Sequence, residues 1–292
     1  MNVCEAPLFV EPADSRGWFQ LNVGLWCASG SLRDAAWPLF EGLRGWLAQT
    51  RQRGALEHWF VRKPPALRLR VRGAGFDDRA REQLASLLQS QHERGLVTSW
   101  GFTTYEPEVA RLGGPVGIEL VHTWLSESAD LWLEWERLSR SGATRLGPDL
   151  MASVLYGELL QRSLGASEEV WDVWLALCRV YDRTAPSVPA HGTAAARGLH
   201  LDAIARLASA AAQALLERGR VAADAFGAGL ARAHDDCTLE GGRRALLGTM
   251  ASFLFNSWCL PPQTIAQLCR RAVHELDPRM PVNPRAPLEL AR

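Results

Sequence analysis

The sequence predicts an α+β fold: a small, mostly antiparallel sheet with flanking helices, extended by a C-terminal helical cluster. Three observations predict this fold. Segments with the aromatic and β-branched residues of strands fall within the first hundred or so residues. Two segments with helical spacing lie between them. After "RLGGPVG" at 111–117, the apolar residues keep helical spacing alone.

Four segments are predicted strands, namely 17–28, 57–62, 67–73 and 97–108. The third belongs to the stretch "ALRLRVRG", in which leucine or valine alternates with arginine. Because successive strand residues point to opposite faces, one face is expected to pack and the other to carry a row of guanidinium groups. The arginines of that row are Arg68, Arg70 and Arg72.

Two helices are predicted among these strands. Ser31 can cap the first, whose apolar stripe runs from Leu32 to Trp46, and Pro38 predicts either a kink or a later start. The second helix covers 77–95, where Gly95 is a suitable C-terminal stop.

Further helices are predicted around 121–138 and 201–215, on either side of a Pro-, Gly- and Ala-rich linker at 182–198. Residues 277–292 have the composition of an extended tail. We therefore expect one α+β domain over residues 1–276, followed by that tail.

The composition excludes some function classes and leaves others open. The 292 residues include 32 basic and 32 acidic side chains, so overall charge does not draw the chain to nucleic acid or to a membrane. No signal peptide and no apolar run of about 20 residues is present, which predicts a cytoplasmic protein. The six cysteines lack a C-x-x-C pair, so neither a metal site nor a disulfide framework is expected.

Several polar groups are candidates for chemistry, each with a structural alternative. The arginine row either lines a binding cleft or is a solvated sheet face. Glu108 and Arg111 stand between a predicted strand and a predicted helix, where side chains often converge on a cleft. Ser252, Asn256 and Ser257 lie among apolar residues of a helix, and either serve a site or bond back to the helix. Most of the 12 tryptophans are expected in the core.

Three stretches carry a family resemblance. "HWFVRKPPALRLRVRG", "YEPEVARLGG" and "SFLFNSW" resemble, in order and spacing, the C-terminal domain of lantibiotic dehydratases, over about residues 15–275. This domain also occurs as a separate protein in thiopeptide antibiotic biosynthesis. The resemblance implies an enzyme that modifies a ribosomally made peptide.

Members of the family that eliminate glutamate from glutamylated serine use an arginine pair, a Glu and Arg before Gly-Gly, and a helical His. The matching residues here are Arg68, Arg70, Glu108 and Arg111. Aligned on Asn256, however, Ser252 stands where the His should be. An unassisted serine is a poor base, so elimination is disfavoured.

The resemblance favours the thiopeptide pyridine synthases, which join two dehydroalanines of an azole-bearing peptide by a formal [4+2] aza-cycloaddition. Loss of water and of the leader peptide then gives a pyridine. We expect an acidic leader, an azole-bearing precursor peptide and other thiopeptide maturation enzymes as partners, and no cofactor. The predicted catalytic residues are Ser252, Ser257, Asn256, Tyr105 and Glu108. The predicted substrate- and leader-binding residues are Arg62, Arg68, Arg70, Arg111, Trp59 and Trp100.

Two alternatives remain open. One is a split lyase that makes dehydroalanine from glutamylated serine with another base, for which His122 is a candidate. The other is a subunit that binds the leader without catalysis.

Overall fold

A four-stranded sheet forms the N-terminal part of the protein. The structure is a computed structural model that describes residues 17–27, 32–184 and 209–279. The strands are β1 (Phe19–Leu25), β2 (Glu57–Val61), β3 (Leu67–Arg72) and β4 (Val97–Thr104). They lie in the order β2-β3-β1-β4, and every neighbouring pair is antiparallel. The predicted α+β fold with a small antiparallel sheet is confirmed.

The alternation predicted for β3 divides the sheet into two chemically different faces. Leu69 is paired with Leu21 of β1 and Phe60 of β2, so apolar residues of three strands share one face. Arg70 is paired with Gln20 of β1 and Trp59 of β2 on the other face. We call these the leucine face and the arginine face.

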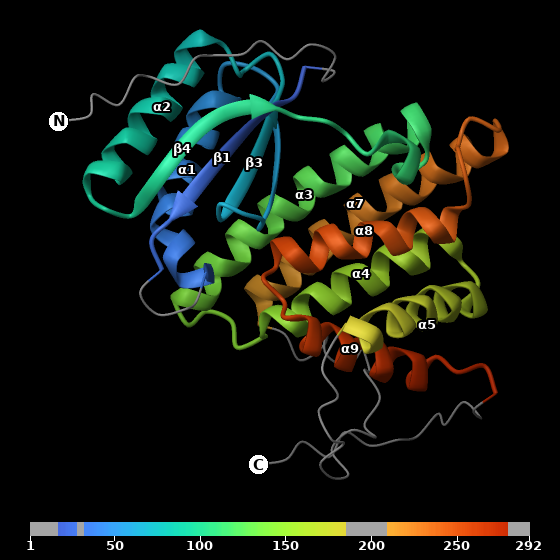
Figure 1. Ribbon diagram of the computed structural model, residues 1–292. Helices are drawn as coiled ribbons and strands as arrows, with labels where there is room; N and C mark the ends of the chain where they lie inside the picture. Colours follow the sequence, from blue (N-terminus) through green and yellow to red (C-terminus); the bar gives the residue numbers. More distant parts are fainter. Residues whose placement is uncertain (1–16, 28–31, 185–208, 280–292) are drawn as a thin grey trace.

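Two helices, α1 (Leu32–Arg51) and α2 (Asp78–Glu93), cover the leucine face (Figure 1). The ring of Phe40 in α1 lies 4.6 Å from the ring of Phe60. Helix α1 starts before Pro38, so the later start considered from the sequence is wrong. Gly95 follows α2 with a φ of 73°, which agrees with the predicted stop.

A short 3-10 helix, η1 (Val109–Leu112), leads from the sheet into the helical cluster. The long central helix of this cluster, α3 (Gly114–Arg140), packs against β2 on one side and against two later helices on the other. The cluster consists of α3 (Gly114–Arg140), α4 (Pro148–Leu164), α5 (Ser167–Thr184), α7 (Ala210–Asp235), α8 (Arg243–Ser257) and α9 (Pro262–Glu275). Helix α3 thus joins the sheet to the rest of the molecule (Figure 1).

Aromatic residues fill the junction between sheet and cluster. Trp132 of α3 is fully buried, with its ring 4.7 Å from Phe40 and 5.1 Å from Phe60. Trp135 and Trp258 are also fully buried, and their rings lie 5.2 Å apart. In the described part of the chain, no helix has the length and apolar character needed to span a membrane.

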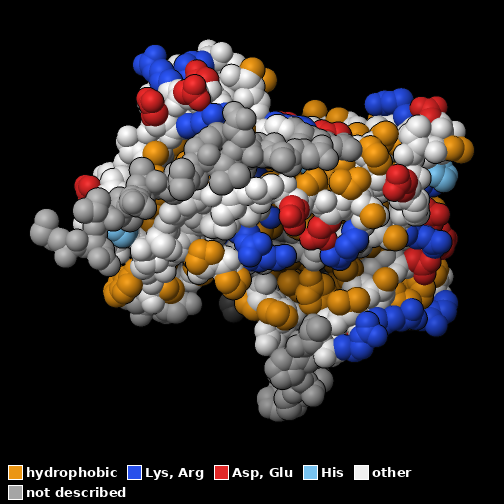
Figure 2. All heavy atoms as spheres, turned by 45° about the horizontal axis from the view of Figure 1, so that its top comes forward, with side chains coloured by type: hydrophobic (Ala, Val, Ile, Leu, Met, Phe, Trp, Pro, Cys, Tyr) orange, Lys and Arg blue, Asp and Glu red, His pale blue; other side chains and the backbone are white. Residues whose placement is uncertain are grey.

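Some sequence predictions fall outside the described residues. These are the cap Ser31, positions 201–208 of the helix predicted at 201–215, and tail residues 280–292. Helix α5 continues to Thr184, so residues 182–184 of the predicted linker are helical, and residues 185–198 of it lie outside the described residues. Figure 2 shows basic side chains lying beside acidic ones over much of one face, as the balanced overall charge suggests.

Candidate functional site

The arginine face meets α3 and α8, and the candidate site lies at this junction. Tyr105, which follows β4, contacts His122 of α3. The ring of Trp59 lies edge-on to Phe253 of α8, with ring centres 5.8 Å apart. Segments more than 100 residues apart in the sequence therefore surround the arginine row.

Arg70 is a buried cation whose direct contacts are with neutral side chains. It is 7% exposed, and its Nε donates to Oε1 of Gln20 at 3.0 Å. The guanidinium carbon lies 4.1 Å from the ring centre of Trp59 and 4.6 Å from that of Tyr105. Among the described residues, no carboxylate lies within ion-pair distance and Nη1 has no hydrogen-bond partner. Burial lowers the pKa of Arg70 to about 10, so it stays protonated at neutral pH.

Tyr105 and His122 form a buried pair behind Arg70. The Tyr105 hydroxyl and Nε2 of His122 are 2.9 Å apart. Burial raises the pKa of Tyr105 to about 12, so the phenol is neutral at physiological pH. His122 is fully buried, with its ring 4.7 Å from Trp18 and 5.9 Å from Trp59. The imidazole is thus enclosed by aromatic rings, and its Nε2 is bound to the Tyr105 hydroxyl.

The other two arginines of β3 have different surroundings. Arg72 forms ion pairs with Glu57 at 2.5 Å and with Glu119 of α3 at 2.6 Å. These two carboxylates and their hydrogen bonds outweigh partial burial and raise the pKa of Arg72. Arg68 is half-buried and donates from Nε and Nη2 to the Pro64 carbonyl, both at 3.3 Å. The three guanidinium groups therefore differ in how far their charge is compensated.

Glu108 and Arg111 form an ion pair at the end of the site, at 2.5 Å. Their helix, η1, runs into Gly113 and Gly114, which have φ values of 82° and 76°. The N–H of Glu240 donates to the Gly113 carbonyl at 3.0 Å, and a Cβ at position 114 would lie 2.5 Å from Cδ of Glu240. The two glycines therefore let the segment before α8 pack directly on this turn.

The three predicted residues of α8 point in different directions. Ser252 is exposed, and its hydroxyl donates to the Thr249 carbonyl at 2.8 Å. Ser257 is buried, and its hydroxyl donates to the Leu254 carbonyl at 2.8 Å. Asn256 binds the backbone of Arg62 through both ends of its amide. The structure therefore leaves Ser252 as the one of the three that faces solvent.

Arg62 and Trp100 lie away from Arg70. Arg62 follows β2 on the leucine face, with its guanidinium carbon 5.0 Å from the ring centre of Trp132. Its Nε donates to the Ser257 carbonyl at 3.2 Å, and burial lowers its pKa. Trp100 is paired with Val23, which places it on the leucine face as well. Neither residue shares a surface with Arg68 and Arg70.

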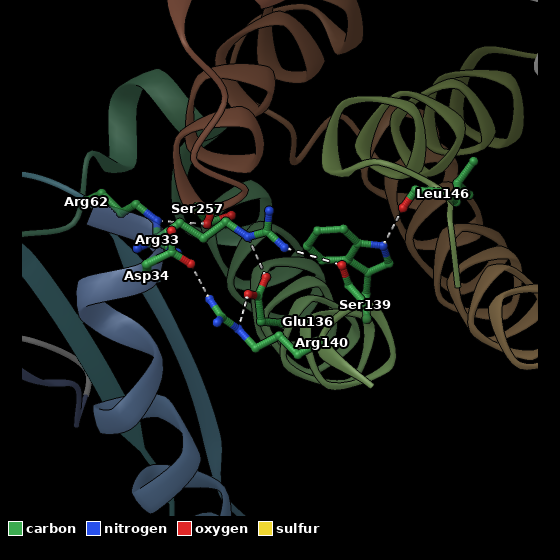
Figure 3. A network of polar contacts seen from close by, with 9 residues as sticks. Arg33, Asp34, Arg62, Glu136, Ser139, Arg140, Leu146 and Ser257 are labelled. Carbon is green, nitrogen blue, oxygen red and sulfur yellow. Dashed lines mark hydrogen bonds and ion pairs between the residues drawn. The ribbon is translucent and has the colours of Figure 1, made fainter. Parts of the chain in front are cut away.

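A charged network surrounds the far end of α3 (Figure 3). Glu136 is fully buried and accepts from Arg33 of α1 at 2.7 Å and from Arg140 at 2.6 Å. Arg140 also pairs with Asp34 at 2.7 Å. This network fixes α1 against α3 and leaves the arginine face on the other side of the sheet.

Gln20 is a site residue that was not predicted from the sequence. It is 7% exposed, and its Nε2 donates to Asn22 at 3.2 Å and to Thr103 at 3.1 Å, which turns Oε1 towards Arg70. The sequence does contain a pattern that could have identified it, because Gln20 and Asn22 alternate with apolar residues in "FQLNV". That alternation places them on a polar face of β1.

A solved structure shares this fold. One such match is the crystal structure of the tRNA-dependent lantibiotic dehydratase MibB from Microbispora sp. 107891, with a TM-score of 0.66 and 15% identity. The alignment covers 91% of this chain and 28% of the MibB chain, so the chain spans less than a third of that protein's length. No curated protein matches the sequence at a significant level.

Sequence similarity identifies the family. The family model described as "Lantibiotic biosynthesis dehydratase C-term" matches residues 18–274, which include the four strands, the helices α1 to α5, α7 and α8, and all but the last residue of α9. This family is associated with enzymes that modify ribosomally made peptides. The chain belongs to the lantibiotic biosynthesis dehydratase C-terminal family.

Proposed function

We propose that the protein is a thiopeptide macrocyclase that forms a pyridine. It joins two dehydroalanines of an azole-containing precursor peptide by a formal [4+2] aza-cycloaddition. Water and the leader peptide are then lost, and the pyridine closes the macrocycle. Its partners would be the precursor with its acidic leader and other thiopeptide maturation enzymes, in the cytoplasm.

One observation supports this proposal most directly. The arginine face offers guanidinium groups that can bind an anionic group, but its described part has no histidine that a substrate could reach. Position 252 is an exposed serine whose hydroxyl bonds to the Thr249 carbonyl. His122 is enclosed and bound to Tyr105. Removal of an α-proton in glutamate elimination needs a base in direct reach of the substrate. Neither Ser252 nor His122 meets that need.

Cycloaddition makes other demands, which the remaining groups fit. The two alkenes are distant in the peptide, so positioning is the largest contribution, worth up to about 7 to 11 kcal/mol in favourable cases. An amide must also become an iminol, which needs hydrogen-bond donors and acceptors rather than a strong nucleophile. Tyr105, Glu108 and Ser252 are groups of this kind.

The roles proposed for the predicted residues follow their contacts. Ser252 and Glu108 are accessible enough to contact the peptide, whereas Asn256 and Ser257 would position α8 against Arg62. Arg68 and Arg111 would contact the acidic leader, because guanidinium groups bind carboxylates well. Trp59 would act through Arg70, against which it packs.

Intact mass analysis tests the proposal directly. The purified protein is mixed with a leader-bearing azole peptide that carries two dehydroalanines. We expect free leader amide and a core product lighter than the substrate by that leader and one water. No macrocycle and no free leader would contradict the proposal.

The same assay separates the alternatives. Loss of the mass of glutamate from a glutamylated peptide would indicate the lyase, for which the match at Arg68, Arg70, Glu108 and Arg111 is the supporting observation. Tight binding of leader without turnover of either peptide would indicate a leader-binding subunit.

A further inference from the structure

We propose, on the basis of the function proposed above, that the three arginines of β3 have separate tasks. Arg72 is structural, Arg68 binds the acidic leader, and Arg70 stabilises the negative charge that develops on the amide oxygen during iminol formation. Gln20 is the positioning residue that holds Arg70 for this purpose. The leader and the reacting amide are therefore recognised by different members of one row.

The first argument is charge compensation. Arg72 has two carboxylates within 2.6 Å, from β2 and from α3, so its charge is already neutralised within the fold. A bound anion would have to displace both carboxylates. Arg72 therefore joins β2, β3 and α3 and is not available to a ligand.

The second argument is the cost of leaving Arg70 uncompensated. Removing a cation from water without a counter-charge destabilises a fold. At 7% exposure Arg70 is such a cation, because its neighbours Gln20, Trp59 and Tyr105 are neutral. A single glutamate in place of Gln20 would neutralise it. Because the Arg70 guanidinium is buried, water screens its positive charge only weakly.

The third argument is orientation. Gln20 donates from Nε2 to Asn22 and Thr103, so its Oε1 is fixed towards Nε of Arg70. Trp59 and Tyr105 contact the guanidinium at 4.1 and 4.6 Å. The hydrogen bond from Nε and the two ring contacts hold the guanidinium in one orientation before the substrate binds. Such preorganised donors stabilise a developing oxyanion more than mobile ones.

Arg68, in contrast, suits an exchangeable partner. Its two hydrogen bonds to the Pro64 carbonyl are long, at 3.3 Å, and it is half-buried. A leader carboxylate can replace this neutral carbonyl with a stronger, charge-assisted bond.

The reaction step balances with the groups present. The amide N–H proton moves to the carboxylate of Glu108, the nitrogen forms a C=N bond, and the carbonyl π electrons move to oxygen beside Arg70. The oxygen then takes the proton back from Glu108. The segment Cβ=Cα–N–C=O becomes the 2-azadiene Cβ=Cα–N=C–OH, with no net gain or loss of protons. Glu108 follows Tyr105 by three residues and is half-buried, with its carboxylate held by Arg111. Its charge also acts to raise the pKa of both Arg70 and Tyr105.

Two measurements on the full chain separate the tasks. The first is the dissociation constant for a fluorescently labelled leader peptide alone. The second is the single-turnover rate with saturating bis-dehydroalanine substrate, followed by intact mass. For Arg70→Gln we expect a rate about 100-fold lower with leader affinity within about 2-fold of wild type. For Arg68→Gln we expect leader affinity about 5-fold weaker and a loss of single-turnover rate much smaller than the loss in Arg70→Gln.

The variant Gln20→Glu is the sharpest test, because it is nearly isosteric and supplies the missing counter-charge, while it removes the Nε2 donor that binds Asn22 and Thr103. We expect its melting temperature to rise and its single-turnover rate to fall by about 10-fold or more, with leader affinity unchanged. Arg70→Gln should keep or raise the melting temperature, whereas Arg72→Gln should lower it. A large loss of stability in Arg70→Gln would make Arg70 structural and overturn the inference.

The outcomes distinguish this inference from the proposed function. If wild type forms the pyridine and Arg70→Gln forms it equally fast, the inference fails and the function stands. Equal losses of leader affinity in Arg68→Gln and Arg70→Gln would also overturn the division of tasks. If wild type gives no macrocycle, both the function and the reaction step are rejected.

Discussion

The side-chain amide of Asn256 pairs with both backbone groups of Arg62. Oδ1 of Asn256 accepts from the Arg62 N–H at 2.6 Å, and Nδ2 donates to the Arg62 carbonyl at 3.0 Å. In return, Nε of Arg62 donates to the Ser257 carbonyl. Asn256 thus continues the hydrogen bonding of β2 beyond Val61, where the strand ends, and fixes the end of α8 to the sheet.

Asn256→Ala should destabilise the protein, because it leaves the Arg62 N–H and carbonyl without these partners. We expect a loss of about 2 kcal/mol in the free energy of unfolding, measured by urea denaturation. Ser252→Ala is the matched control in the same helix, since its exposed hydroxyl bonds only to the Thr249 carbonyl. It should change stability by less than about 0.5 kcal/mol.

Ser252→Ala should instead lower turnover of the bis-dehydroalanine substrate more than it lowers leader affinity. The reason is that Ser252 is proposed to contact the reacting part of the peptide and not the leader. Comparing the single-turnover rate with the leader dissociation constant checks this. Equal losses in both would contradict a role in the transition state.

Glu136→Gln should cost far more stability than Glu134→Gln, two residues earlier in α3. Glu136 is fully buried between Arg33 and Arg140, and removing its charge leaves both cations without that partner. Because the arginines are partly exposed, we expect about 2 to 3 kcal/mol rather than the full cost of a buried pair. Glu134 pairs with Arg137 at the surface, so its loss should cost less than about 1 kcal/mol. Similar costs in urea denaturation would contradict the structural role of Glu136.

His58 should make stability fall in mildly acidic solution. Burial is the main cause that lowers its pKa to about 4; nearby Arg51 adds to this, while Asp130 partly opposes it. The unfolded chain, with a histidine pKa near 6.5, binds a proton that the folded protein does not. Stability from this group is therefore complete above pH 6.5 and is lost as the pH falls towards 4. Between pH 7.5 and 5.0 the loss should be about 2 kcal/mol.

The check is the free energy of unfolding at both pH values for wild type and His58→Gln. The difference in the free energy of unfolding between pH 7.5 and pH 5.0 should be about 2 kcal/mol smaller in the variant than in wild type. His234→Gln, at an exposed position, is the control and should leave the difference unchanged. An unchanged difference in His58→Gln would show that other groups cause the acid sensitivity.

Gly114→Ala should be more destabilising than Gly95→Ala, although both glycines have φ values near 75°. The backbone strain is shared and costs about 1 kcal/mol in each variant. At Gly114 the new methyl group would also lie 2.5 Å from Cδ of Glu240, whereas nothing lies within 4 Å at Gly95. Thermal unfolding should show a lower melting temperature for Gly114→Ala, and equal values would contradict close packing of Glu240 on this turn.

Much of the fold could be predicted from local sequence patterns. The alternation in "LRLRVR" is enough to place Leu69 and Arg70 on opposite faces, because strand geometry has a period of two. Helical spacing likewise predicted α3 and the change to helices after residue 117. Pro38 left a kink or a late start of α1 open, and the helix begins at Leu32, since packing of the Phe40 side of α1 on the sheet outweighs one missing backbone hydrogen bond.

The candidate site could be predicted only in part. The family resemblance selected Arg68, Arg70, Glu108 and Arg111, but the sequence placed Arg62 and Trp100 with them. Strand pairing puts Trp100 beside Val23 on the leucine face, and Arg62 packs there over Trp132. The sequence does not show the pairing register between strands, and a shift of one residue in that register reverses the face on which a side chain lies.

By itself the sequence determined that three arginines lie on one face of a strand, because alternation is a property of each residue and its immediate neighbours. It could not determine which of the three has a counter-charge. That depends on Glu57 and Glu119 reaching Arg72, and on Gln20, Trp59 and Tyr105 surrounding Arg70. These partners come from other strands and from α3, so only the tertiary structure decides that Arg72 is neutralised while Arg70 is buried with its charge uncompensated.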